Sequence, residues 1–408
     1  MTSSATLLKE RLPAISASPT NNTFLDALRH IDYGQLTIIT PQETHLNFMG
    51  AKAGPVATMA IKDWEVFDDL IGRGEIGFAE AYIEGRWDSP DLPMLLTFGL
   101  VNNESLEHFF HGKPFYAAWL RLKAALRENS LSGSRRNIME HYDLGNDFYA
   151  LWLDESMTYS SGLFQGDIGR SLEHAQQAKY ERILDKLGAR QGDHILELGC
   201  GWGGFARAAA KHGIRVTGVT ISPEQAIYAT NRNIKEGFDP LISIELRDYR
   251  ETQGEFDYVV SIGMFEHVGE KFWPEYFKTV RKRLKPMGKA MVQSITLDNH
   301  LFEDLRGVNG FIETYIFPGG MLPSKFRFRE AAEKSGLACQ EMFGFGQDYA
   351  TTLEHWRNRF IARREDVRKM GYDERFLRMW DFYLSSCMAS FISERTDVIQ
   401  AELTPEDA

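Results

Sequence analysis

The sequence predicts a doubly wound α/β fold of the Rossmann-like type, and three observations favour it. First, apolar runs of strand length alternate with helical stretches from residue 141 onward. Second, the strand His194–Leu198 leads directly into residues 199–204, four of which are glycine and leave the backbone bare. Third, polar residues follow several of the expected strands, at the sheet edge where such folds bind ligands.

Composition sets the limits of what the protein can be. The chain has 408 residues, 43% of them hydrophobic, enough for one large or two ordinary domains. The net charge of -11 argues against nucleic acid as a partner and leaves any contact with an anionic membrane to local basic clusters. The three cysteines lack metal-ligand spacing, so we expect no metal and a cytoplasmic location. We find no signal peptide and no run long enough to span a membrane.

The N-terminal part is expected to be a separate unit. Residues 1–23 are interpreted as flexible, and residues 24–110 as a small α+β module that contacts lipid or a partner. Its expected elements are strands at 36–40 and 46–50 and helices at 62–73 and 78–84. Residues 111–140 follow as a basic amphipathic helix and a linker. Either an ordinary packed helix or a surface for anionic lipid fits that stretch.

Residues 141–408 are expected to form the α/β domain. After the first strand, the expected strands are 215–222, 242–248, 256–265, 289–296 and 337–345. The expected helices are 172–187, 224–236 and 272–284. These strands are expected to run parallel, and a last alternating segment, 397–403, is expected to close the sheet in the antiparallel sense.

The glycine-rich turn fits more than one ligand, and two details favour S-adenosylmethionine (AdoMet). Glu197 lies at the end of the first strand, where a carboxylate can face a cationic or ribose-bearing ligand. The next strand ends on Thr220 rather than on the acid expected to hold the ribose of NAD. Two alternatives stay open, an NAD-dependent oxidoreductase and a lipid-binding protein on a decayed methyltransferase scaffold.

Polar residues after the next three strands extend the candidate site. Ser222 and Gln225 form a capping box, so Gln225 either only caps the helix or also contacts the ligand. Asp248 and Tyr249 follow the third strand and can hold an adenine, with a helix cap as the alternative for Asp248. Glu266 follows a mostly apolar run, so we expect its carboxylate to be partly desolvated, which favours a functional role.

Seven ordered segments resemble the cyclopropane fatty acid synthases, which include the mycolic acid cyclopropane synthases. They are 141–147 (HYDLGND), 157–160 (MTYS), 198–204 (LGCGWGG), 218–222 (GVTIS), 263–269 (GMFEHVG), 315–320 (YIFPGG) and 348–353 (DYATTL). The stretch 72–88 also resembles the N-terminal module of the family, so the likeness covers most of the chain. An ordered set of motifs is far more specific than a glycine pattern alone.

The resemblance implies transfer of the AdoMet methyl group to a cis double bond in an acyl chain of a membrane phospholipid, which forms a cyclopropane fatty acid. It also implies a peripheral location at the inner face of the membrane, and a homodimer is possible. Residues 301–324 would form a lid over the lipid channel. The expected AdoMet contacts, which include three glycines of the turn, are Tyr159, Ser160, Glu197, Gly199, Gly201, Gly203, Thr220, Ile221, Gln225, Asp248 and Tyr249.

The family is thought to use a bound bicarbonate ion as the base that completes the ring. The candidate catalytic residues by this match are Glu266, Ile295, Tyr349, Ser161, Gln293 and Cys387. Ser161 and Gln293 replace a cysteine and a histidine of the family, which leaves open an open-chain, methyl-branched product. Cys387 matches a cysteine long regarded as catalytic, although a buried inert thiol fits its apolar surroundings equally well.

Overall fold

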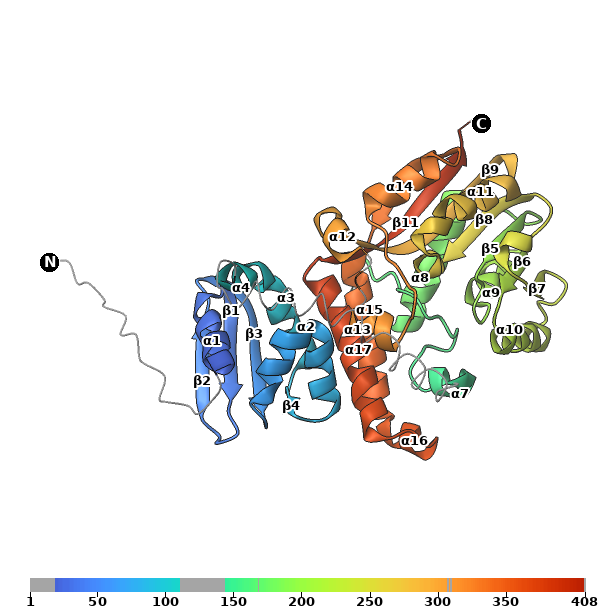
Figure 1. The fold of residues 1–408 in the computed structure, drawn as a ribbon. Helices are drawn as coiled ribbons and strands as arrows, with labels where there is room; N and C mark the ends of the chain where they lie inside the picture. The colour runs from blue at the N-terminus through green and yellow to red at the C-terminus, as the bar shows by residue number, and fades with distance from the viewer. Residues whose placement is uncertain (1–18, 111–143, 168, 307, 309, 407–408) are drawn as a thin grey trace.

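Two β-sheets organise the molecule. The computed structural model describes residues 19–110, 144–167, 169–306, 308 and 310–406. The small sheet has the order β2-β1-β3-β4, with bounds Tyr33–Ile39 (β1), His45–Met49 (β2), Lys52–Ile61 (β3) and Trp87–Asp88 (β4). Four helices accompany it: α1 (Pro19–Ala27), α2 (Glu65–Ile83), α3 (Leu92–Val101) and α4 (Asn103–Phe110). In Figure 1 these elements form the blue part of the ribbon.

The N-terminal helices differ from the expected ones in one place. Helix α1 begins at Pro19, inside the stretch expected to be flexible. The range of α2 contains two helical segments, because Gly74 between them has non-helical angles (φ 62°, ψ −142°). Only glycine adopts such angles readily, so the helix breaks where the sequence pattern separates two helices. The basic stretch at 115–128 and its linker lie outside the described residues.

The large sheet has seven strands in the order β10-β11-β9-β8-β5-β6-β7. Their bounds are His194–Leu198 (β5), Arg215–Thr220 (β6), Ile242–Leu246 (β7), Phe256–Ile262 (β8), Leu284–Leu297 (β9), Leu337–Gly344 (β10) and Thr396–Pro405 (β11). Strands β5 to β9 pair in parallel, and β11 pairs antiparallel with both β9 and β10. The expected α/β sheet with an antiparallel last strand is confirmed, although β11 lies inside the sheet and β10 forms its edge.

The helices of residues 145–392 include those that cover both faces of the large sheet. Their bounds are Gly145–Ala150 (α7), Leu172–Leu187 (α8), Gly204–Lys211 (α9), Pro223–Glu236 (α10), Trp273–Arg283 (α11), Asn299–Leu305 (α12), Phe311–Tyr315 (α13), Lys325–Glu333 (α14), Gly346–Ala362 (α15), Arg364–Lys369 (α16) and Glu374–Ile392 (α17). Successive residues of β5 enter different apolar cores: Ile195 packs with α8 and α9, whereas Leu196 packs with α11 and α14. This alternation is what a parallel strand covered on both faces requires.

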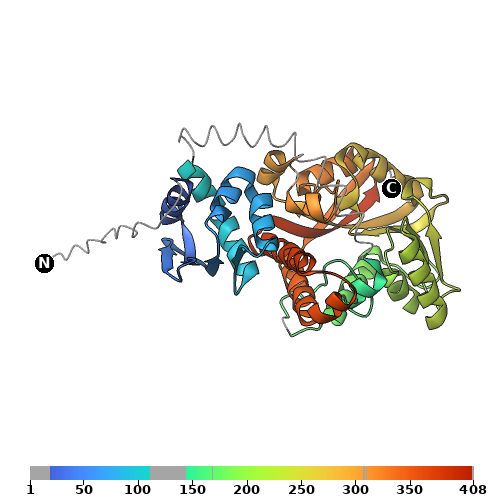
Figure 2. The same cartoon turned by 60° about the horizontal axis from the view of Figure 1, so that its bottom comes forward.

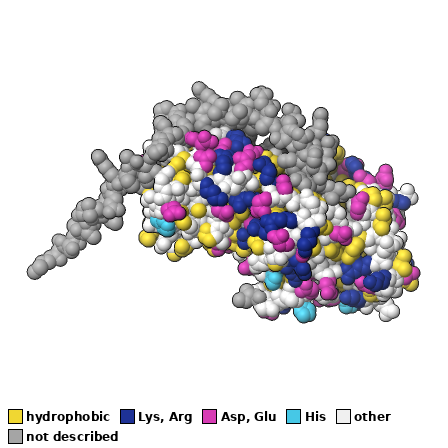
Figure 3. All heavy atoms as spheres, turned by 90° about the horizontal axis from the view of Figure 1, so that it is seen from below, with side chains coloured by type: hydrophobic (Ala, Val, Ile, Leu, Met, Phe, Trp, Pro, Cys, Tyr) yellow, Lys and Arg dark blue, Asp and Glu magenta, His cyan; other side chains and the backbone are white. Residues whose placement is uncertain are grey.

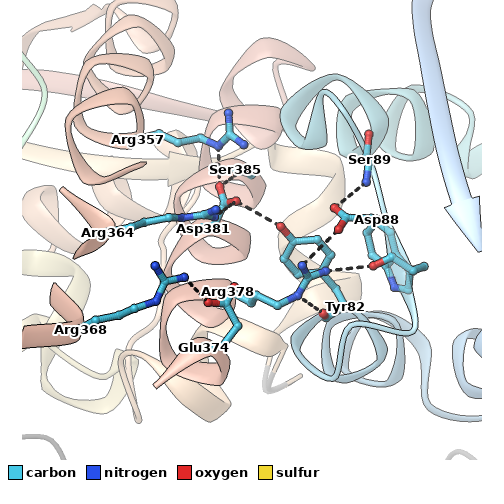
Figure 4. A network of polar contacts seen from close by, with 11 residues as sticks. Tyr82, Asp88, Ser89, Arg357, Arg364, Arg368, Glu374, Arg378, Asp381 and Ser385 are labelled. Atoms are coloured by element: carbon cyan, nitrogen blue, oxygen red, sulfur yellow. Dashed lines mark hydrogen bonds and ion pairs between the residues drawn. The ribbon is translucent and has the colours of Figure 1, made fainter. Parts of the chain in front are cut away.

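Helix α17 joins the two parts of the molecule. It contacts α2 and α3 on one side and α15 on the other, and Figures 1 and 2 show it between the small sheet and the large one. A buried polar network reinforces this contact (Figure 4). Asp381 of α17 accepts hydrogen bonds from Arg357 Nε (2.6 Å), Arg364 Nη2 (3.0 Å) and the Tyr82 hydroxyl (3.1 Å). The Arg378 guanidinium stacks on the Tyr82 ring at 3.9 Å. Tyr82 of α2 therefore contacts two charged residues of α17, Asp381 and Arg378.

Candidate active site

One cavity of about 1680 Å³ extends from the glycine-rich turn after β5 to the apolar interior of the N-terminal part. Small-molecule sites usually measure about 300–1,000 Å³, so this cavity has room for more than one substrate. The ends of β5, β6 and β8 border it, as the parallel sheet predicts. Its far part is lined by apolar side chains that include Phe24, Leu36 and Met59.

The glycine-rich turn brings bare backbone to the cavity. Gly201 has φ +53°, and a Cβ atom built on it would meet no atom within 4 Å, because it would enter open space. Gly203 behaves differently and does not line the cavity. A Cβ on Gly203 would lie 3.2 Å from the Cβ of Ala229 on α10, so this glycine allows close helix packing rather than ligand contact. Its expected role in cofactor binding stays a prediction, which this packing does not support.

Polar groups from β6 and β7 line the next part of the cavity. The Thr220 hydroxyl donates to Gln225 Oε1 at 2.9 Å, and the Ser222 hydroxyl accepts from the Gln225 amide at 3.3 Å. Ser222 therefore caps α10, but Gln225 turns to Thr220 and does not complete the expected capping box. Asp248 accepts from the Arg250 amide at 3.0 Å and pairs with the Arg250 guanidinium at 2.7 Å, which lowers the pKa of its carboxyl. The remaining expected residues here, Ile221 and Tyr249, also line the cavity.

A buried acid and a buried lysine lie behind the turn. The Glu197 side chain lines the cavity, and its Oε2 atom makes no hydrogen bond within the described part of the chain. Burial raises the pKa of Glu197 to about 8, and Arg207 and Lys179 counteract this only in part. Lys179 of α8 is completely buried, and its ammonium donates to the Ser160 hydroxyl at 2.7 Å. Burial lowers the pKa of Lys179 to about 7, opposed by Asp154 and Glu197.

Glu266 is another buried carboxyl in the cavity wall. It is 8% exposed, Oε1 accepts from the Ile295 amide at 2.7 Å, and Oε2 has no partner among the described residues. Burial raises its pKa to about 7, while the hydrogen bonds from backbone amides oppose that rise. The expected desolvation after the apolar run is confirmed. A carboxyl with a pKa near neutral can both hold and release a proton.

The other candidate catalytic residues divide into two groups. Gln293, Tyr349 and Cys387 line the same cavity as Glu266. Gln293 Oε1 accepts from Gln400 Nε2 at 3.1 Å, so this oxygen already has a partner. Ser161 does not line the cavity, because its hydroxyl donates to the Gly162 carbonyl at 2.8 Å and is fully buried. Its expected place in the anion-binding cluster stays a prediction, which this orientation does not support.

Cys387 lies in the cavity wall on α17. Burial raises the pKa of its thiol, and the nearby carboxylates of Glu313 and Glu75 raise it further. A thiolate is the reactive form of cysteine, so these surroundings favour the inert, protonated thiol.

Aromatic rings enclose the space between the turn and Glu266. The Tyr159 and Tyr383 hydroxyl groups are 2.8 Å apart, and burial raises the pKa of both well above the usual tyrosine value. The Phe317 ring lies 6.3 Å from that of Tyr159 and 6.0 Å from that of Tyr383. These faces can stabilise a cation. Sequence reasoning missed Tyr383, since nothing in the pattern of α17 indicates that this residue reaches Tyr159.

Sequence reasoning also missed Lys179, although a signal for it exists. Leu172, Ala175, Gln176, Lys179 and Ile183 follow helical spacing, and all of them are buried in α8. A lysine on such a buried face is unusual, because an ammonium seldom leaves water without a specific partner.

The fold and site define an AdoMet-dependent methyltransferase. Among solved structures, the cyclopropane synthase MmaA2 from Mycobacterium tuberculosis is similar, with 30% identity, a TM-score of 0.58, and coverage of 65% of this chain and 96% of that one. Mycolic acid cyclopropane synthase CmaA1, solved with SAH and CTAB, is also 30% identical, with a TM-score of 0.60 and the same coverage. Coclaurine N-methyltransferase is 20% identical and shares the fold, with a TM-score of 0.61. The match covers 82% of this chain and 100% of that one.

Within that class, the chain belongs to the mycolic acid cyclopropane synthetase family, whose model matches residues 129–401. Tuberculostearic acid methyltransferase UfaA1 of Mycobacterium tuberculosis is 38% identical over 82% of this chain and 80% of its own length. Cyclopropane-fatty-acyl-phospholipid synthase of Escherichia coli K12 is also 38% identical, over 82% of this chain and 84% of its own length. The family resemblance inferred from the motifs is confirmed.

Proposed function

We propose that the protein transfers the methyl group of AdoMet to a cis double bond in an unsaturated acyl chain of membrane phospholipid and forms a cyclopropane fatty acid. The observation that carries this proposal is the single cavity that joins the glycine-rich turn, the aromatic chamber with Glu266, and a long apolar extension into the N-terminal part. A site for a polar cofactor alone would not need that extension. The name of the Escherichia coli relative supports the same reaction.

AdoMet would occupy the part of the cavity nearest the sheet. Gly199 and Gly201 offer bare backbone, and Tyr159 and Ser160 border the same space. The side chains of Thr220 and Gln225 would approach the ribose, and Tyr249 the adenine. When bound, AdoMet supplies an electrophilic methyl group.

Replacement of Gly201 by valine is expected to lower AdoMet affinity by more than about tenfold. The new side chain would enter the open space of the cavity, and a β-branched residue is strained at φ +53°. Isothermal titration would measure the affinity. Gly237→Val is the matched control, because Gly237 has φ +77° and open space but lies at the end of α10, outside the cavity. Equal affinity in a folded Gly201→Val protein would contradict the placement of AdoMet.

The reaction requires a dry and aromatic chamber. An alkene is a weak nucleophile, so the chain must be held in line with the methyl donor and away from water. The cation formed on methyl transfer would lie among Tyr159, Tyr383 and Phe317, whose ring faces favour positive charge. The apolar extension of the cavity would hold the rest of the acyl chain.

Ring closure then needs a base near the new methyl group. Bicarbonate, which the family resemblance implies, supplies that base when bound. The residues that would hold it are Tyr349, Gln293 and Glu266, whose Oε2 atom has no partner among the described residues. A Glu266 carboxyl that is protonated near neutral pH can donate to such an anion. The residues present therefore fit the ion, although Ser161 is not among them.

An open-chain, methyl-branched product is the second candidate, supported by the name of the UfaA1 relative and by glutamine at position 293. Gln293→His is expected to change the ratio of cyclopropane to branched product by about threefold or more, because it adds a titratable group inside the cavity. Ser161→Cys should leave that ratio unchanged, since its side chain is turned away. Mass spectrometry of the fatty acids measures both. A shift caused by Ser161→Cys alone would contradict this assignment.

A membrane surface is the proposed source of the lipid. No helix within the described ranges is long and apolar enough to cross a membrane. On the face in Figure 3, Lys and Arg side chains lie among Asp and Glu, so that face offers no uniform attraction for anionic lipid. The candidate basic stretch at 115–128 lies outside the described residues, and its contact with lipid stays a prediction. A homodimer likewise stays a prediction.

One experiment tests the proposed function. The protein is incubated with AdoMet and vesicles of cis-unsaturated phospholipid, and the released fatty acids are analysed by mass spectrometry. We expect a gain of one methylene unit with loss of the double bond. Vesicles of saturated phospholipid serve as the control and should give no product. Absence of product from unsaturated vesicles, with AdoMet bound, would contradict the proposed substrate.

A further inference from the structure

Helix α8 holds Ser160 at two points. Gln176 and Lys179 lie one turn apart on the buried face of the helix, where the neighbouring side chains are apolar. Gln176 Nε2 donates to the Ser160 carbonyl at 2.8 Å, and Lys179 Nζ donates to the Ser160 hydroxyl at 2.7 Å. Both the backbone and the side chain of Ser160 are therefore fixed by α8.

The bond from Lys179 decides what the Ser160 hydroxyl can do. An ammonium group only donates, so Ser160 must accept this bond with a lone pair and keep its own proton for another partner. No described residue accepts that proton, and Ser160 lines the cavity. The hydroxyl is thus available as a donor to a ligand, and the adjacent ammonium strengthens it toward an anionic acceptor.

The charge of Lys179 also lacks a structural explanation. Burial of an ammonium is costly, and one hydrogen bond to a hydroxyl does not offset that cost. The carboxyl groups of Asp154 and Glu197 attract it, although neither forms a hydrogen bond or ion pair with it in the described chain. An apolar side chain would fill this place more favourably if packing were its only task. An anion bound next to Ser160 would supply the missing compensation.

We propose that Lys179 is a positioning residue for the carboxylate of the methionine group of AdoMet, and that it acts through the hydroxyl of Ser160. This inference rests on the proposed placement of AdoMet in the cavity. It assigns a binding role to a residue of α8 that does not line the cavity itself. The methionine group of AdoMet also carries an ammonium. Glu197 lies in the same cavity, and its unpartnered Oε2 atom can accept a hydrogen bond from that ammonium.

The test compares AdoMet with decarboxylated AdoMet, which differs only in the absent carboxylate. Lys179→Met keeps the length of the side chain and removes the charge. We expect it to weaken binding of AdoMet about tenfold or more and to leave binding of decarboxylated AdoMet nearly unchanged, as measured by isothermal titration. A purely structural role would affect both ligands alike. Lys186→Met is the matched control on α8, because Lys186 is 41% exposed and pairs with Glu341.

A second variant keeps the proposal falsifiable if Lys179→Met does not fold. Ser160→Ala should cause the same selective loss, and in the double variant the two effects should not add, because both remove one hydrogen-bonded chain. Equal losses for the two ligands, or no loss, would overturn the role of Lys179. If the unaltered protein binds AdoMet but does not prefer it over the decarboxylated form, the inference also fails. If it binds neither ligand, the proposed cofactor site fails with it.

Discussion

Replacement of Glu266 by glutamine is expected to lower methyl transfer by about a hundredfold or more, while AdoMet affinity stays nearly unchanged. Glutamine can still accept the bond from the Ile295 amide, so the backbone of β9 keeps its partner. What it loses is the ability to take up and release a proton in a chamber where burial brings the pKa of the carboxyl to about 7. Single-turnover rates and titration calorimetry separate the two effects.

The control for this variant is Glu275→Gln, an equal change at an exposed position in the first turn of α11. Stability provides a second check. The pKa of Glu266 is raised from 4.5 to about 7 in the folded protein, so its contribution to stability is present at low pH and is lost as pH rises through that interval. The glutamine variant lacks this loss and should be at least as stable as the parent at pH 8. Turnover that survives in Glu266→Gln would remove Glu266 from the reaction.

Replacement of Asp381 by alanine is expected to give the largest loss of stability. Removal of one partner of a buried ion pair costs about 3–5 kcal/mol. Arg357 and Arg364 are 19% and 30% exposed, so water compensates in part. We therefore expect a decrease of about 2–3 kcal/mol in the free energy of unfolding. The Tyr82 hydroxyl would lose its acceptor at the same time, which loosens the contact of α2 with α17.

Urea denaturation measures this decrease as a lower transition midpoint. Asp366→Ala is the matched control, because Asp366 pairs with Lys369 and Arg363 at the surface of α16, where water screens the pairs, and should leave the midpoint nearly unchanged. Equal midpoints for the Asp381 and Asp366 variants would show that the network in Figure 4 does not hold α2 to α17.

The sequence predicted the large sheet well because strand length and helical period are local signals. Helix α8 has the predicted bounds, and the strands differ mainly at their ends. The position of β11 could not be predicted, because it depends on distant contacts. Strand β11 enters the sheet beside β9. The partner of a strand is not encoded within a short window of sequence.

The candidate site shows the same division. Residues at strand ends, such as Thr220 and Glu266, reach the cavity because the parallel sheet gathers its carboxyl ends at one edge. No comparable rule predicts which way a side chain in a loop points. Ser160 faces the cavity, whereas Ser161 turns to the Gly162 carbonyl. Tyr383 and Lys179 come from helices that approach the cavity only in the folded protein.

The internal position of β11 also constrains how the nascent chain folds. Strand β10 pairs with β11 and, within the described sheet, with no other strand. Helices α15, α16 and α17 separate these two strands in the sequence. During synthesis, β10 must therefore leave the ribosome well before β11. Its backbone N–H and C=O groups stay unpaired until β11 has been made. Such an edge can pair with other chains. The β10 edge of the large sheet can thus form only after β11 has been synthesised, when β5 to β9 and the N-terminal part have had time to fold.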